Sequence, residues 1–252
     1  MGIGDWLLAT ADAKFYHQKH GLPVVFAHPK TSKPQWSQVF QNNPKILKDP
    51  YPGQKCVVDR NHGGGHRPYH EGYDGENLQF TWNYSFKAEP GELFLSKDEK
   101  AVGIPGAVII EPNTKDAELS RNKAWPWERW QALVDSLPLP WVQLGDREAK
   151  TLNGVTRVAT KHFREALGWL EKASLVVTTD GALHHAAAAL GRPAVVLWGG
   201  LVPPQILGYD THKNIGHAQW WCGYNKPCDH CSAAMKAISV EEVMEAVREM
   251  RA

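Results

Sequence analysis

The chain has 252 residues, of which 42% are hydrophobic and 22% charged, with a formal net charge of +1 at pH 7. This composition is ordinary for a folded globular protein, and four cysteines are too few for a disulfide-based scaffold of this size. No apolar run reaches the roughly 18 residues of a spanning helix, and no signal peptide is evident, so we expect a cytoplasmic protein without a transmembrane segment.

Positive charge is concentrated near the N-terminus. Residues 1–70 contain nine Lys and Arg residues but only four acidic residues. Such an excess favours a phosphate-bearing partner on this part of the chain, although an unevenly charged solvated surface would give the same count.

The first third of the chain predicts one helix and two strands. Apolar residues recur at helical spacing over residues 6–20, with Asp5 as a candidate N-cap and Gly21 as the stop. Residues 24–27 and 55–59 read as short strands. Four aromatic residues then alternate over residues 80–86, which predicts a strand or hairpin. Pro-Gly pairs at residues 90–91 and 105–106 indicate turns in a connecting segment, and we therefore place a domain boundary near residue 104.

The remainder of the chain alternates strands and helices. We expect strands at residues 107–111, 141–144, 175–179 and 194–198, and helices at residues 127–137, 163–173, 182–190 and 240–250. This alternation predicts an α/β fold with a parallel sheet covered on both faces. Ligands of such sheets bind at the carboxyl ends of the strands.

Missing motifs exclude several kinds of chemistry. The sequence has no G-x-S-x-G elbow, no Walker A motif and no complete dinucleotide fingerprint, so we expect neither a serine hydrolase nor an NAD enzyme. No D-x-D pair occurs, although carboxylate pairs usually hold the divalent ion of metal-dependent sugar transferases. We therefore expect no metal and no cofactor in the reaction.

One strand-to-helix junction is suited to a diphosphate. Residues 175–179 form a buried strand that delivers Asp180 and Gly181 to a helix N-terminus, where free backbone N–H groups attract anions. Lys123, after an earlier strand, would neutralise a leaving phosphate. Alternatively, Asp180 is a simple helix cap and Lys123 a solvated loop lysine.

Several stretches resemble glycosyltransferase family nine, the ADP-heptose:lipopolysaccharide heptosyltransferases. They are GDWLLATADA (residues 4–13), NKAWPWERWQALVDSL (122–137), WVQLGD (141–146), LVVTTDGALHHAAAALGRPAVVLWGG (175–200) and MKAISVEEV (235–243). The resemblance implies a GT-B-like α/β fold of two Rossmann-like domains with parallel sheets, the N-terminal one reduced. Residues 1–104 would form the acceptor-side domain and residues 105–252 the nucleotide-sugar donor domain.

The same resemblance implies roles for individual residues. Asp5 matches the family's general base, and Lys123 matches a lysine that contacts the donor diphosphate. Asp180 and His185 match donor-site residues. Gly181, which stands where the family usually has Thr, and Gly199 complete the expected donor-binding set. Independently of the family, inverting sugar transfer needs a base to accept the proton of the attacking hydroxyl, which a carboxylate can do.

Two further clusters stand outside this set. The glycine-rich segment NHGGGHRPY places His62, His66 and Arg67 in a loop, which we assign to the acceptor side. Cys222, Cys228 and Cys231 have thiolate chemistry suited to zinc, but their C-x5-C-x2-C spacing is not a standard zinc motif, and structural thiols are the alternative.

The sequence therefore predicts a metal-independent, inverting glycosyltransferase that uses a nucleotide-diphosphate sugar. Its acceptor would be a hydroxyl of an envelope glycan or of a modified base in DNA. A non-catalytic nucleotide-sugar-binding module and a sugar-nucleotide epimerase on the same fold are the alternatives. Neither the donor base and sugar nor the oligomeric state is specified by the sequence.

Overall fold

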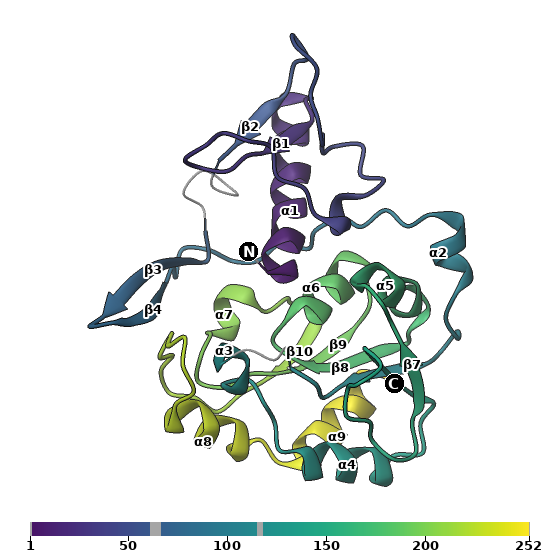
Figure 1. The fold of residues 1–252 in the computed structure, drawn as a ribbon. Coiled ribbons are helices and arrows are strands. Elements are labelled where there is room, and N and C mark those ends of the chain that lie inside the picture. The colour runs from purple at the N-terminus through teal and green to yellow at the C-terminus, as the bar shows by residue number, and fades with distance from the viewer. Residues whose placement is uncertain (1, 61–66, 115–117, 252) are drawn as a thin grey trace.

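The structure is a computed structural model that describes residues 2–60, 67–114 and 118–251 (Figure 1). A six-stranded sheet with helices on both faces forms the C-terminal part, and a long N-terminal helix lies over one of these faces. Within the described ranges, no helix combines the length and apolar character needed to cross a bilayer.

The large sheet confirms the predicted parallel α/β architecture. Its strands are β5 (Val108–Glu111), β6 (Trp141–Gly145), β7 (Thr156–Ala159), β8 (Leu175–Thr179), β9 (Ala194–Leu197) and β10 (His212–Ile215). They pair in parallel in the order β10-β9-β8-β5-β6-β7. The chain starts in the centre at β5, builds outward to β7, and then returns to build the other half from β8. This is the doubly wound order, with its switch point between β5 and β8.

Two apolar layers cover the sheet. The helices of this part are α3 (Glu118–Arg121), α4 (Trp127–Ser136), α5 (Phe163–Lys172), α6 (Ala182–Ala189), α7 (Pro204–Leu207), α8 (Asp229–Ala237) and α9 (Val240–Glu249). Successive strand residues point to opposite faces, so Ile109 packs in the layer that holds α5 and α6, while Val108 and Ile110 pack in the layer that holds α4 and α9. Strands buried on both faces explain the continuous Val/Ile/Leu runs.

The N-terminal part is smaller. It contains α1 (Ile3–His20), β1 (Val24–Phe26), the 3-10 turn η1 (Gln38–Phe40), β2 (Val57–Asp59), β3 (Tyr69–Asp74), β4 (Asn77–Trp82) and α2 (Lys97–Ala101). β1 and β2 form a two-stranded parallel sheet against α1, and β3 and β4 form an antiparallel hairpin that projects from the body (Figure 1).

Local details differ from the sequence-based expectations. Gly2, not Asp5, is the N-cap of α1; Asp5 is the third residue of the helix, within its first turn, and accepts a hydrogen bond from the Gly2 N–H at 2.8 Å. The hairpin begins at Tyr69, earlier than the aromatic alternation indicated, because residues 69–74 carry too few apolar side chains to show a period of two. The short elements β7, β10, α2, α3 and α7 and the helix α8 were also not predicted.

The two parts share one hydrophobic layer. Leu7 of α1, Phe26 of β1 and Phe40 of η1 belong to the same buried cluster as Val176 of β8 and Leu207 of α7. Helix α1 lies directly against α6. The division near residue 104 stays a prediction, but the apolar core runs across it without a break.

A buried arginine ties the two parts together. Arg164 on α5 is 5% exposed and forms an ion pair with Glu99 of α2, with Nη2 donating to Oε2 at 2.6 Å. The same guanidinium donates to the carbonyl oxygens of Gln38 and Phe94 at 3.1 and 2.9 Å. Every branch of the guanidinium is therefore paired with a group from the N-terminal part.

The Arg164–Glu99 ion pair predicts that the folded protein becomes less stable in acid. Hydrogen bonds from Arg164 lower the pKa of Glu99 from 4.5 to about 2. A depressed carboxyl pKa stabilises the fold at neutral pH, and that stabilisation is lost as the pH falls from about 4.5 toward 2. Replacing Glu99 with Gln leaves a buried, unpaired guanidinium, so Glu99→Gln should cost about 3 kcal/mol at neutral pH.

Urea denaturation of wild type and Glu99→Gln from neutral pH to about pH 3 measures both effects. The wild type should lose more stability on acidification than the variant. Glu165→Gln, which removes an acid whose side chain is 40% exposed on the same helix, is the matched control and should behave like wild type. Equal losses in wild type and Glu99→Gln would show that the ion pair does not link stability to pH.

Candidate functional site

A cavity of about 710 Å³ opens at the switch point of the sheet. The ends of β5 and β8 and the start of α6 line one side of it. The N-terminus of α1 and the β3–β4 hairpin line the other. Because the connections after β5 and β8 leave the sheet toward opposite faces, a crevice must form between these two strand ends.

Helix α6 presents its N-terminus to this cavity. Gly181 is the N-cap, and Thr178, Thr179 and Asp180 lead into it from β8. The Gly181 N–H donates to Nδ1 of His184 at 3.0 Å, while the following turn adds the positive end of the helix dipole. An anionic group in the cavity would be stabilised here.

Lys123 and Asp180 form an ion pair in the wall of the cavity. Nζ of Lys123 lies 2.5 Å from Oδ2 of Asp180, and the two side chains are 20% and 5% exposed. Lys123 follows α3, and Asp180 follows β8, so the pair joins the two strand-to-helix connections of the crevice. The partly exposed ammonium is the cationic group that an incoming diphosphate would meet.

Two adjacent histidines stand beside this pair as neutral side chains. Burial lowers the pKa of His184, whose Nδ1 accepts from Gly181, so Nε2 carries the proton and faces the carbonyl of Leu207 at 3.2 Å. Burial also holds the pKa of His185 well below its usual range, and its Nδ1 contacts the Tyr209 hydroxyl at 2.7 Å. Neither imidazole supplies a positive charge at neutral pH.

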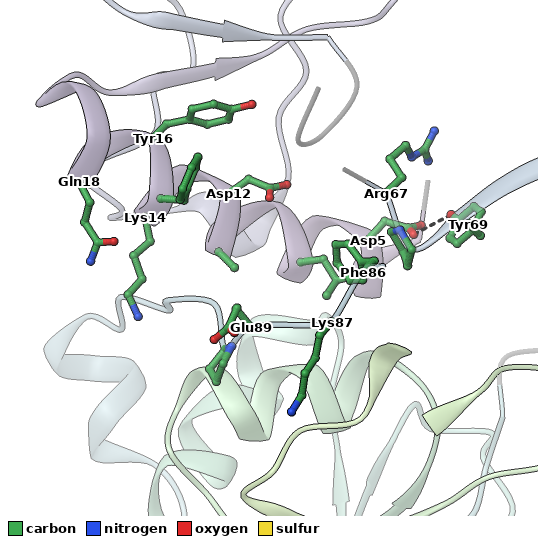
Figure 2. Close-up of a pocket in the computed structure, with 15 residues that line it drawn as sticks. Asp5, Asp12, Lys14, Tyr16, Gln18, Arg67, Tyr69, Phe86, Lys87 and Glu89 are labelled. Atoms are coloured by element: carbon green, nitrogen blue, oxygen red, sulfur yellow. Dashed lines mark hydrogen bonds between the residues drawn. The ribbon is translucent and has the colours of Figure 1, made fainter. Parts of the chain in front are cut away.

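Asp5 faces the same cavity from α1. Its Oδ1 accepts a hydrogen bond from the Tyr69 hydroxyl at 2.9 Å, and its Oδ2 accepts from the Gly2 N–H (Figure 2). Burial and the neighbouring carboxylate raise the pKa of Tyr69, so the phenol stays protonated and remains a donor. Both oxygens of the carboxylate are thus fixed in direction by groups from two segments.

A second cavity, of about 530 Å³, also has Asp5 in its lining (Figure 2). Leu8 and Tyr69 line both cavities with Asp5. Its remaining polar lining comes from α1, the start of β3 and the segment before residue 90, and comprises Asp12, Lys14, Tyr16, Gln18, Arg67, Lys87 and Glu89. Arg67 lies over the Tyr69 ring, with Cζ 5.3 Å from its centroid.

Each cavity is also lined by a half-buried acid with a raised pKa. Burial raises the pKa of Glu111, at the end of β5, to about 8, although its carboxyl accepts the Asn113 N–H at 2.8 Å. Burial and the nearby Asp59 raise the pKa of Asp12 to about 7. Glu111 is therefore mainly neutral at pH 7, and its charge changes on mild alkalinisation.

The structure gathers most of the predicted site. Asp5, Lys123, Asp180, Gly181 and His185 line the larger cavity, and Arg67 lines the smaller one. Gly199 is not part of either lining; an added Cβ there would lie 2.7 Å from the carbonyl oxygen of Asn122, so close packing accounts for the glycine. Its donor-binding role stays a prediction, and His62 and His66 lie outside the described residues.

Two residues beside the predicted set matter for the site. Glu111 had a signal, since it ends a central strand of the predicted sheet, where ligands bind. Tyr69 ends the segment that we assigned to the acceptor side, but its contact with Asp5 left no signal, because it joins residues separated by 64 positions. The three cysteines near the C-terminus do come together: their Sγ atoms lie within 4.8 Å of one another.

Part of the chain is similar in sequence to known glycosyltransferases. Residues 142–236 match the profile of glycosyltransferase family 9 (heptosyltransferase). Over 127 residues, the chain is 30% identical to lipopolysaccharide heptosyltransferase 1 of Salmonella typhimurium strain LT2, a match that covers 46% of this chain and 38% of that protein. It is 32% identical over 124 residues to the enzyme of the same name from Escherichia coli K12, covering 44% and 37%. The chain therefore spans less than half of these relatives.

Among solved structures, the chain resembles the iron-containing dodecameric glycosyltransferase TibC from enterotoxigenic E. coli H10407. The TM-score is 0.51 at 16% identity, over 65% of this chain and 50% of that one. This similarity concerns the fold alone. Residues 142–236 of this chain are similar in sequence to the glycosyltransferase family 9 heptosyltransferases, and each of the sequence matches covers less than half of the chain.

Proposed function

We propose that the protein is a glycosyltransferase that moves a sugar from a nucleotide-diphosphate donor to an acceptor hydroxyl, with Asp5 as the general base. One observation carries this proposal: the Asp5 carboxylate lines both cavities and shares the larger one with the Lys123–Asp180 pair. A base at the boundary between a donor cavity and an acceptor cavity is what direct sugar transfer requires.

The donor would occupy the larger cavity. Its diphosphate would lie at the N-terminus of α6 near Lys123, where backbone N–H groups and an ammonium offset the negative charge. The curated relatives are lipopolysaccharide heptosyltransferases, and a structure of TibC contains ADP-D-β-D-heptose. ADP-heptose is therefore the first donor to test.

The leaving group can be stabilised without a divalent cation in this proposal. As the bond to the sugar breaks, negative charge builds up on the diphosphate, and Lys123 with the helix dipole opposes it. Asp180 holds the ammonium in place and would not itself touch phosphate. Asp180, His184 and His185 lie close enough to share an ion, but Lys123 already pairs with Asp180, and Nδ1 of His184 accepts from Gly181.

The reaction would invert the anomeric carbon. Asp5 would accept the proton of the acceptor hydroxyl as its oxygen attacks from the side opposite the diphosphate, in one displacement. The Tyr69 hydroxyl donates to Oδ1 and orients the carboxylate, so Tyr69 would act as a positioning residue. A single displacement of this kind needs no covalent sugar–enzyme intermediate.

The acceptor would enter through the smaller cavity. Arg67 and Lys14 line it beside the acids Asp12 and Glu89, so the cavity offers cationic contacts for a phosphate group and carboxylate contacts for the hydroxyls of an envelope glycan. The relationship to lipopolysaccharide heptosyltransferases favours such a glycan over a base in DNA. A protein that binds the donor without transferring the sugar, or that epimerises it, would contradict the proposal.

The first test concerns the base. Asp5→Asn keeps the acceptor oxygen for the Gly2 N–H but removes the basicity, so turnover should fall roughly 10²–10⁴-fold while donor affinity is unchanged. Tyr69→Phe should lower kcat about tenfold, with little change in the KM for the donor, because it removes only the orienting hydrogen bond. Steady-state kinetics with ADP-heptose and a lipopolysaccharide-core acceptor measures both effects.

Asp98→Asn on the exposed face of α2 is the matched control and should retain wild-type turnover. Wild-type turnover in Asp5→Asn would place the base elsewhere, with His185 the next described residue to replace.

The second test separates the donor role of Lys123 from its structural role. Lys123→Met leaves a buried Asp180 unpaired, so it should lower both stability and donor affinity. The double variant Lys123→Met/Asp180→Asn removes both charges and should recover stability. Its affinity for the nucleotide sugar should still be about 10- to 100-fold weaker, the loss of one charge-assisted contact.

Thermal unfolding and calorimetry give the two readouts. Recovery of both stability and affinity in the double variant would mean that Lys123 serves only to neutralise Asp180.

The third test uses the raised pKa of Glu111. Its carboxyl is neutral below about pH 8 and becomes an anion above it, in the cavity proposed for the diphosphate. Donor affinity should therefore decrease as the pH rises through about 8. Glu111→Gln should remove that decrease, and calorimetry from about pH 6.5 to 9.5 measures it. An equal decrease of donor affinity with pH in wild type and Glu111→Gln would show that the charge of Glu111 does not affect donor binding.

A further inference from the structure

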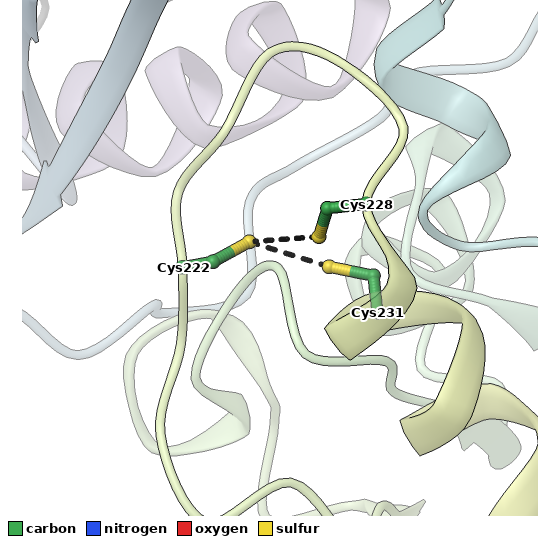
Figure 3. A group of neighbouring side chains, drawn as sticks. All are labelled: Cys222, Cys228 and Cys231. Atoms are coloured by element: carbon green, nitrogen blue, oxygen red, sulfur yellow. Dashed lines mark hydrogen bonds between the residues drawn. The ribbon is translucent and has the colours of Figure 1, made fainter. Parts of the chain in front are cut away.

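Three cysteines form a compact cluster away from the two cavities (Figure 3). Cys222 lies in the segment after β10, Cys228 is the N-cap of α8, and Cys231 is in the first turn of that helix. The Sγ atom of Cys222 lies 3.7 Å from that of Cys228 and 3.3 Å from that of Cys231. Cys222 and Cys231 are 2% and 0% exposed, so the cluster is largely shielded from water.

These separations suit thiolates around a common ion. Metal–sulfur bonds of about 2.3 Å in a tetrahedral site place neighbouring sulfur atoms about 3.8 Å apart. A disulfide would need sulfur atoms about 2.05 Å apart, much closer than any pair here. The three thiols converge on one another from two segments, whereas isolated structural cysteines would each pack against apolar side chains.

The loop that carries the cluster is fixed by a buried side chain outside it. Asn122 is 1% exposed, and its Oδ1 accepts the Cys228 N–H at 2.9 Å. Its Nδ2 donates to the carbonyls of Tyr224 and Lys226 at 3.1 and 2.8 Å. The backbone around the thiols is therefore held in place by the residue that precedes Lys123.

The same loop also extends the β3–β4 hairpin. The Phe80 N–H donates to the Gly223 carbonyl at 2.8 Å, and the Asn225 N–H donates to the Leu78 carbonyl at 3.1 Å. Tyr224 forms an antiparallel bridge with Gln79, whose side chain donates to the Cys222 carbonyl at 2.8 Å. Residues 223–225 thus run antiparallel along β4 and join it through an isolated bridge.

The hairpin in turn carries Tyr69. Tyr69 pairs with Trp82 across the two strands, and its hydroxyl donates to Asp5. A continuous series of hydrogen-bonded segments therefore runs from the cysteine cluster through β4 and β3 to Asp5.

We propose that Cys222, Cys228 and Cys231 together bind one thiophilic divalent cation, Zn²⁺ or Fe²⁺, and that this site fastens the β3–β4 hairpin to the C-terminal part. The three thiols release their protons to solvent as the metal–sulfur bonds form. Three thiolates leave one position of a tetrahedral site for a water molecule. The site is structural, since the three cysteines belong to neither cavity lining and supply no group to the chemical step of the proposed sugar transfer.

Metal content tests the site directly. The full chain, purified without chelator, should contain about one equivalent of zinc or iron by elemental analysis. Cys231→Ser should lose this metal, whereas Cys56→Ser, which alters the cysteine before β2 that is not in the cluster, should keep it. Co²⁺ added to metal-free wild-type protein should give the visible bands and the sulfur-to-metal charge-transfer band of a tetrahedral thiolate site.

A second measurement remains decisive if Cys231→Ser fails to fold. Amide hydrogen exchange of the wild type is compared in metal-loaded and metal-free protein that retains its circular dichroism. Removal of the metal should accelerate exchange at Phe80 and Asn225 but not in the central strand β8.

Folded wild-type protein without zinc or iron and without the cobalt thiolate bands would overturn the proposal. So would a Cys222–Cys231 disulfide detected by mass spectrometry, or exchange at Phe80 and Asn225 that does not depend on the metal. Each of these results leaves the Asp5 and Lys123 tests unaffected.

Discussion

The packing of α1 on α6 is the constraint on which the site depends. Both helices begin at the larger cavity, so their N-termini face a common space. The contact is close: an added Cβ at Gly4 would lie 3.3 Å from Cδ2 of His185. Because Asp5 is next to Gly4 and His185 lies in the turn that follows Asp180, this one packing contact sets the position of the carboxylate relative to the Lys123–Asp180 pair. Two further interactions between the N-terminal and C-terminal parts stabilise that packing: the apolar layer that they share and the Arg164–Glu99 ion pair.

Charge in the site is arranged by burial. His184 and His185 are held neutral, and Glu111 is mainly neutral at pH 7, so Lys123 is the principal cation in the wall of the larger cavity among the described residues. Its partner Asp180 is too buried to leave unpaired. The Lys123 ammonium therefore lies where the diphosphate of the proposed donor would become the leaving group. A second cation in the wall would strengthen the binding of donor and product alike, and such uniform binding does not accelerate the reaction.

Three segments remote in sequence meet at Asp5: the start of α1, the β3–β4 hairpin and, through that hairpin, the loop of residues 222–225. Hairpins that project from a body have few contacts of their own and open easily. Here the backbone hydrogen bonds between β4 and residues 223–225 add contacts, and the proposed metal site would hold the start of that segment in place. The orientation of Asp5, the proposed general base, is therefore linked to a loop more than 200 residues away in the chain.

The sequence by itself determined the parallel α/β core, because strands buried on both faces appear in the sequence as continuous apolar runs. It also indicated Asp5, Lys123, Asp180 and His185, through local motifs at strand ends and through the family resemblance. Only the tertiary structure decided that Asp5 is an in-helix residue with Gly2 as the cap, that Tyr69 orients it, and that Glu111 is buried enough to hold its proton. It also brought together cysteines whose spacing matches no standard motif. These features arise from contacts between segments that are distant in the sequence and from the burial of side chains away from water. Neither produces a periodic pattern that can be recognised in the sequence.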